Sequence, residues 1–245
     1  MRKILTFVLL IVVLGGCTLA SQTPTPTSVP PVILPPPATE APTLVPSPEN
    51  PQSRMPDLCG NPYYPVVNGA TYFYQLSSGE NVIRTMQTDE TTQKFTILVS
   101  SAGTNAKIEG QCISDGIVIM ETPGSTTTTS DEEGTSTVTT QTSSGVTLPN
   151  DLAPGKQWSQ TIRVVTESGE SLIQSDYRAI GFEEVTVPAG TFTALKIEQN
   201  GYVTVFDQKI AMEGLVGWYV EGIGLVRFEV PGAPVSELTM YDLGD

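Results

Sequence analysis

The candidate reactive side chains considered first are the 26 acidic residues and the three cysteines. The 245 residues include no histidine. Without histidine, the chain lacks the usual general base of nucleophilic triads and the commonest ligand of zinc sites. Paired carboxylates can hydrolyse glycosides, but that activity depends on their separation in space, and so many acids produce chance pairs. The formal charge of −14 opposes nucleic-acid binding, because it repels a phosphate backbone. We therefore expect no cofactor, no nucleic-acid partner and no catalysis.

A run of three acids, Asp131-Glu132-Glu133, is the one cluster that suggests a cation, because calcium prefers carboxylate oxygens. The alternating acids and distal glutamate of an EF-hand loop are absent from its surroundings. The run is therefore expected to be a solvated acidic loop, and we predict no metal site.

The amino terminus has the organisation of a signal peptide. Arg2 and Lys3 precede an apolar run from Ile4 to Leu14, in which Thr6 is the one polar residue. A membrane-spanning helix needs about 20 apolar residues, so this run is too short to span a bilayer comfortably. Its length fits the apolar region of a signal peptide instead.

The apolar run ends in Leu14-Gly15-Gly16-Cys17, which resembles the bacterial lipobox. In lipobox proteins the cysteine receives a diacylglyceryl group, and the signal peptide is cut immediately before it. The resemblance implies that Cys17 is lipidated and that Leu14, Gly15 and Gly16 are recognised by the signal peptidase. The acyl chains would anchor the protein to the cell membrane on its extracytoplasmic side. An ordinary secretory signal, with Cys17 as a chance thiol, is the alternative.

Composition divides the rest of the chain into a stalk and a folded domain. Residues 17–56 are rich in Pro, Thr, Ser and Ala and contain no aromatic residue. Because proline fixes φ and removes backbone donors, this segment is predicted to be a disordered linker between the lipid anchor and the domain. Residues 1–16 are then the signal peptide, and residues 57–245 are the domain.

Residues 57–245 carry the pattern of an all-β domain. Short runs of β-branched and aromatic residues alternate with turn residues, and no window has convincing helical periodicity. Residues 158–165 and 194–198 alternate between apolar and polar, which predicts strands with one packed and one wet face. A sheet with one covered face must curl on itself, pack on a second sheet or hold something apolar. We predict a strongly curved antiparallel sheet of about ten strands, forming a half-barrel or an open barrel.

Two segments carry local predictions of their own. Asn200-Gly201 is the strongest hairpin signal, because this dipeptide favours the φ > 0 turn that matches strand twist. Residues 121–149 are of low complexity and rich in Thr and Ser. They are predicted to form either a long strand pair with a mobile tip or a disordered surface loop.

Cys59 and Cys112 remain once Cys17 is lipidated, and an even pair in an exported chain predicts one disulfide. A redox pair or a reactive thiol is the alternative. It lacks support, because the sequence has neither a C-x-x-C motif nor a basic cluster that would lower a thiol pKa.

Two stretches near the carboxyl terminus, V-P-A-G-T-F at 187–192 and W-Y-V-E-G-I-G-L-V at 218–226, form a recognisable pattern. It resembles the pattern of uncharacterised bacterial envelope and lipoprotein β domains, which implies a curved antiparallel sheet broadly akin to lipoprotein-carrier half-barrels. Pro188 and Gly190 suit a tight reversal, and Gly222 and Gly224 allow a bend before the next strand.

Aromatic residues of the predicted strands are the candidates for a ligand surface. The wider set also includes Phe73, Phe192 and Tyr219. The residues chosen as candidate ligand-facing aromatics are Tyr72, Tyr74, Trp158 and Trp218. Core packing is the alternative role, because aromatic residues in strands usually fill the core.

Together these features favour a non-enzymatic, surface-displayed lipoprotein whose β domain is a binding or structural module of the envelope. Its expected partners are the membrane, through Cys17, and a hydrophobic ligand or an envelope protein. The alternative is a carrier or sensor that holds a lipid or other hydrophobic ligand in the concave face of the sheet. A hydrolase with paired carboxylates is the third hypothesis. An apolar cavity of several hundred Å³ would favour the carrier, and a filled core would favour the module.

The lipoprotein prediction is tested at the mature amino terminus. Mass spectrometry of protein purified from its own cells should show an acylated Cys17 as the first residue. A free thiol at this position, or cleavage elsewhere, would exclude the lipid anchor.

Overall fold

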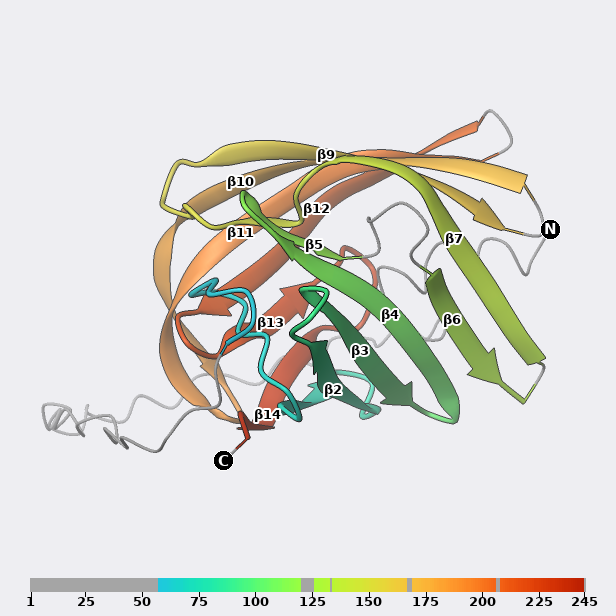
Figure 1. The fold of residues 1–245 in the computed structure, drawn as a ribbon. Coiled ribbons are helices and arrows are strands. Elements are labelled where there is room, and N and C mark those ends of the chain that lie inside the picture. The colour runs from blue at the N-terminus through green and yellow to red at the C-terminus, as the bar shows by residue number, and fades with distance from the viewer. Residues whose placement is uncertain (1–56, 120–125, 133, 167–168, 206–207, 245) are drawn as a thin grey trace, which may run out of the picture.

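The computed structural model describes residues 57–119, 126–132, 134–166, 169–205 and 208–244. These residues fold into one antiparallel sheet of 14 strands, so the predicted all-β class is confirmed. Figure 1 shows how strongly this sheet curves. No helix in this part of the chain is long and apolar enough to cross a membrane. The predicted signal peptide, lipidation site and stalk lie outside the described residues.

The strands fall into two groups along the chain. The strands before residue 150 are β1 (Thr71–Leu76), β2 (Asn81–Asp89), β3 (Lys94–Ser101), β4 (Thr104–Ile113), β5 (Gly116–Ile119), β6 (Thr126–Asp131), β7 (Gly134–Gly145) and β8 (Leu148–Pro149). Those that follow are β9 (Gln157–Thr166), β10 (Gly169–Val187), β11 (Gly190–Val205), β12 (Gln208–Val220), β13 (Gly224–Glu229) and β14 (Ser236–Asp242).

The sheet closes into a barrel of 12 strands. Its order is β3-β2-β1-β14-β13-β12-β11-β10-β9-β7-β6-β4, and β4 returns to pair with β3. The other edge of β4 is shared, since residues 105–108 pair with β6 and residues 110–113 pair with β5. β8 pairs with β5 outside the ring. The curved sheet predicted from sequence is therefore a closed barrel, with a few more strands than expected.

Hairpin turns assign the two ends of the barrel. Because neighbouring strands are antiparallel, the last residues of β1, β3, β6, β9, β11 and β13 lie at one end, which we call the mouth. The backbone N–H of Ser77, in the turn after β1, donates to the carbonyl of Val235, before β14, at 2.8 Å. The turns after β2, β4, β10 and β12 lie at the opposite end, which we call the closed end.

Residues 57–70, which we call the cover segment, lie across the closed end. The Asn61 side chain is fully buried and donates to the carbonyl of Pro149, in β8, at 3.1 Å. The backbone N–H of Gly222, in the turn after β12, donates to the carbonyl of Pro62 at 2.7 Å. The cover segment is therefore hydrogen-bonded to two separate parts of the closed end.

Residues 126–145 form a strand pair, β6 and β7, so this part of the low-complexity segment is a hairpin rather than a disordered loop. Glu132 lies in its exposed turn. Pro188 and Ala189 form the predicted tight reversal between β10 and β11. Gly222 and Gly224 adopt φ values of 74° and 102° at the turn between β12 and β13, which only glycine adopts readily.

The predicted hairpin turn at Asn200-Gly201 is wrong, because both residues lie inside β11 and pair with β10. The register between β11 and β12 shifts between Gln199 and Gly201, so the dipeptide forms a β-bulge. A Cβ at Gly201 would lie 2.0 Å from the carbonyl oxygen of Gln174. Glycine is therefore required here by the close approach of β10, and a turn with positive φ does not form.

The structure forms the predicted disulfide between Cys59, in the cover segment, and Cys112, near the end of β4. The two cysteines are 53 residues apart in the sequence. The disulfide links the cover segment to the strand that closes the ring, so it joins the two parts of the chain that enclose the interior.

Removing this disulfide should weaken the fold. The double variant Cys59→Ser, Cys112→Ser is expected to lower the free energy of unfolding by about 4 kcal/mol, because the unfolded chain regains the entropy of a long open loop. Urea unfolding of the variant and of the oxidised wild type measures this difference. Equal midpoints and slopes would show that the bond adds nothing to stability.

Candidate functional site

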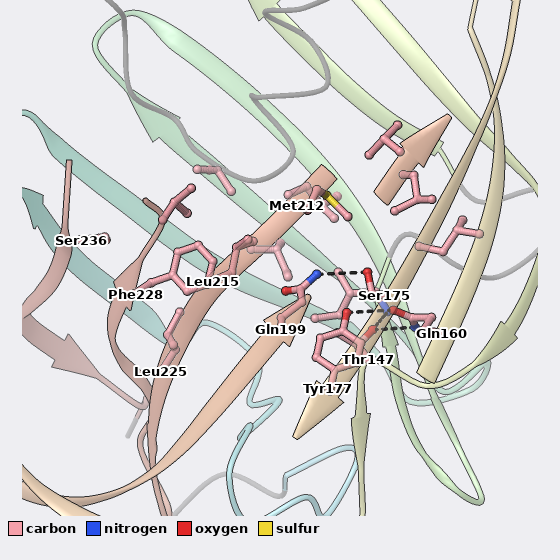
Figure 2. Close-up of a pocket in the computed structure, with 18 of the residues that line it drawn as sticks. Thr147, Gln160, Ser175, Tyr177, Gln199, Met212, Leu215, Leu225, Phe228 and Ser236 are labelled. Atoms are coloured by element: carbon pink, nitrogen blue, oxygen red, sulfur yellow. Dashed lines mark hydrogen bonds between the residues drawn. The ribbon is translucent and has the colours of Figure 1, made fainter. Parts of the chain in front are cut away.

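The ring encloses a cavity of about 310 Å³, part of which is drawn in Figure 2. Barrel diameter grows with strand number, and the side chains of about eight strands are just sufficient to fill an interior. A ring of 12 strands is wider than this. The interior is filled near the cover segment and stays open further toward the mouth.

Strand register defines the floor of the cavity. Arg84, Gln160 and Gln199 are the deepest inward-facing lining residues of β2, β9 and β11. Further toward the closed end, Met86 and Ile197 are buried in core clusters and do not line the cavity. The cavity therefore ends at the level of Arg84 and extends from there to the mouth.

The walls above the floor are apolar. The lining residues occupy every second position along their strands, because alternate side chains of a strand point to the same face. The wall residues include Val82, Ile97, Val99, Ile162, Ile173 and Val203. Thr166, the last residue of β9, and Ser171, near the start of β10, line the cavity toward the mouth.

A chain of polar side chains lies at the floor on the β9, β10 and β11 side (Figure 2). The Tyr177 hydroxyl donates to Gln160 Oε1 at 3.2 Å, and Gln160 Nε2 donates to Thr147 Oγ1 at 3.4 Å. Gln199 Nε2 donates to Ser175 Oγ at 3.1 Å. Gln160 and Ser175 are almost fully buried, so these bonds replace the water that burial removes. The floor therefore combines an apolar enclosure with fixed polar groups.

Arg84 lies at the floor on β2, across the ring from β10 in strand order. It is the one charged residue among the described residues that line the cavity. Its guanidinium carbon lies 4.9 Å from the centre of the Tyr74 ring, which is a cation–π contact. A positive charge is therefore held inside a largely apolar cavity.

Tyr64 and Tyr219 also line the cavity close to Arg84. Burial raises the pKa of Tyr219 to about 12, although the Arg84 charge acts in the opposite direction. Burial likewise raises the pKa of Tyr64 and Tyr74, and Arg84 again lowers both. All three phenols are therefore neutral hydrogen-bond donors at physiological pH.

The structure places the predicted ligand-facing tyrosines in the packed interior, outside the cavity lining. Tyr72 is 4% exposed, and its buried hydroxyl has no hydrogen-bond partner among the described residues. Tyr74 is equally buried, and its hydroxyl donates to the carbonyl of Leu225 at 2.9 Å. Both side chains support the floor from below.

The two predicted tryptophans also lie outside the lining. Trp158 stacks on its cross-strand partner Tyr177 with ring centres 5.1 Å apart, so it holds this floor residue in place from the neighbouring strand. Trp218 lies between Lys196 and Arg227, whose charged groups are 5.3 Å and 5.2 Å from its ring centre. Of the aromatic residues considered from sequence, Tyr219 is the one that faces the cavity.

Sequence reasoning missed Arg84 and Gln160. The sequence contains a weak signal for an inward-facing polar residue. Each of the two lies two residues from an apolar residue and therefore shares a strand face with it. Gln160 has this spacing to Ile162, and Arg84 has it to Val82 and Met86. Such a residue on a packed face must either be paired or serve a ligand.

The cavity lining differs from the paired-carboxylate site that a hydrolase of this kind would need. No Asp or Glu is among its described residues, so it holds no carboxylate pair. No group of three or more His, Cys, Asp or Glu side chains in the described residues could hold a metal ion. The floor supplies a fixed cation and neutral donors, which suit recognition of a polar head.

The raised tyrosine pKa predicts a loss of stability at alkaline pH. Because folded Tyr219 ionises near pH 12 and an unfolded tyrosine near 10, its contribution is fully present below pH 10 and is lost between pH 10 and about 12. Urea unfolding at intervals of pH should show this fall. Tyr219→Phe should show a shallower fall, and identical pH dependence in both proteins would contradict the burial of this hydroxyl.

Comparisons with known proteins identify the family. No curated protein matches the chain. The chain is similar to a Bacteroides fragilis structure described as an exported protein with a YmcC-like fold, with 13% identity, a TM-score of 0.42, and coverage of 74% of this chain and 98% of that one. It is also similar to a Parabacteroides distasonis structure described as a lipoprotein, with 14% identity, a TM-score of 0.40, and coverage of 74% and 99%. The DUF3108-like family matches residues 80–230, more than half of the chain, and the chain therefore belongs to this family.

Proposed function

We propose that this chain is an exported, membrane-anchored, non-enzymatic protein whose barrel carries or senses a hydrophobic ligand. The observation that carries the proposal is the cavity of about 310 Å³ with apolar walls. Small-molecule sites in proteins are typically apolar clefts of about 300–1,000 Å³ with a few placed polar groups. The cavity has this size and this distribution of groups.

A packing defect does not account for the cavity. Protein interiors are close-packed, and natural voids larger than a water molecule are few. The closed end of this barrel follows that rule, with Val66, Ala70 and Leu238 fully buried there. The open space begins at one level of the ring and continues toward the mouth, which is the form of a binding site.

A purely structural module of the envelope would be served as well by a filled interior. The cavity therefore favours the carrier or sensor over that alternative. The lipobox resemblance at Cys17 and the Pro-rich stalk support the same role. They would hold the barrel within roughly 100 Å of a membrane, which is a store of hydrophobic molecules.

A neutral fluorescent probe tests this proposal. N-phenyl-1-naphthylamine should bind the full mature chain carrying Cys17→Ser, which has no acyl chains of its own, with a rise in fluorescence. Ile173→Trp places a large ring into the cavity and should lower the affinity by about tenfold or more. Fluorescence titration measures both effects.

The matched control is Ile180→Trp, the same substitution in the same strand at an exposed position. It should leave the affinity unchanged. Absence of binding to the wild type would overturn the proposal, and so would equal affinities of the two tryptophan variants.

A further inference from the structure

Arg84 is a cation without a counter-ion in the described part of the chain. Arg84 is partly buried and forms no ion pair or hydrogen bond with any described residue. The other partly buried cations of the described residues each contact a carboxylate: Lys156 with Asp151, Lys196 with Glu183, and Arg227 with Glu229. Arginine stays charged at all accessible pH values, so it cannot relieve its burial by losing a proton.

Two more donors lie beside this cation. Tyr64 and Tyr219 line the same cavity close to Arg84, and their hydroxyls form no hydrogen bond with a described residue. Arg84, Tyr64 and Tyr219 together present donors, while no carboxylate lines the cavity to oppose an incoming anion. This combination is complementary to a negatively charged group.

The cavity is also polarised along its length. The donors are at the floor, and the apolar walls separate them from the mouth. A molecule that satisfies both regions has an anionic head and an apolar chain, with the head innermost. A volume of about 310 Å³ lies at the lower limit for small-molecule sites, which favours a ligand with one acyl chain over a two-chain lipid.

We propose that the ligand is a single-chain anionic amphiphile that enters head first, with its carboxylate or phosphate bound by Arg84 at the floor. The proposal rests on the proposed function, because it requires a ligand in the cavity. It adds the chemical class and the orientation of that ligand.

Displacement of bound N-phenyl-1-naphthylamine tests the class. Sodium palmitate, hexadecyl phosphate and hexadecanol have the same chain and differ in the head. At least one of the two anions should displace the probe at a concentration about tenfold or more below that of the alcohol. A stronger effect of palmitate identifies a carboxylate ligand, and a stronger effect of hexadecyl phosphate identifies a phosphate ligand.

Variants at Arg84 test the site. Arg84→Met should lower the affinity for the preferred anion by about tenfold or more, while the affinity for the neutral probe changes by less than about twofold. Arg84→Lys keeps the charge and should retain part of the preference. Arg178→Met, which removes an exposed arginine of β10, is the control and should have no effect.

The outcomes separate this inference from the function on which it rests. If the probe does not bind the wild type, the proposed function fails. If the probe binds but the anions and the alcohol displace it equally, or if Arg84→Met keeps the anion preference, only the anionic class is overturned. Should Arg84→Met not fold, the wild-type comparison of heads and the Arg84→Lys variant still decide.

Discussion

Pairing of β3 with β4 closes the ring, and the rest of the structure depends on this closure. Each strand of the ring then has a neighbour on both sides, which removes the open edges that an isolated curved sheet would expose. Closure at 12 strands also sets an interior that is wider than the side chains of the strands fill. The cover segment occupies one end of that interior, held by the disulfide to β4. The cavity is the part that remains.

The sequence was sufficient for the class of fold and insufficient for its closure. Alternation in residues 158–165 correctly indicated strands with one packed face, because that pattern is local. Closure also requires β1 to pair with β14, the last strand of the domain, and no local signal specifies a pairing between strands so distant in the sequence. The error at Asn200-Gly201 has the same origin. A turn preference of two residues was outweighed by the continuous ladder between β10 and β11, which extends well beyond it on both sides.

The candidate site was harder to predict, because strand parity decides which residues face inward. In β2, Val82, Arg84 and Met86 share one face, and Ile83 and Thr85 share the other. Both faces contain apolar residues, so the sequence does not select between them, and a shift of one residue exchanges them. Trp218 and Tyr219 illustrate the consequence. The sequence analysis selects Trp218 as the ligand-facing residue. Adjacent residues of a strand point to opposite faces, and the structure places Tyr219 inside.

The chain is acidic overall, whereas its cavity contains a cation. In the proposed function these charges would act at different steps, namely the approach of the ligand and the binding of its head. A formal charge of −14 repels anions in solution, but at physiological ionic strength this field decays over about 8 Å. Attraction by Arg84 is equally local, so it cannot draw an anion toward the mouth. An apolar chain can enter without either field, because burial of its surface is favourable and independent of charge. In the proposed function the walls would therefore supply most of the affinity, and Arg84 would supply the choice of head and the orientation of the bound molecule.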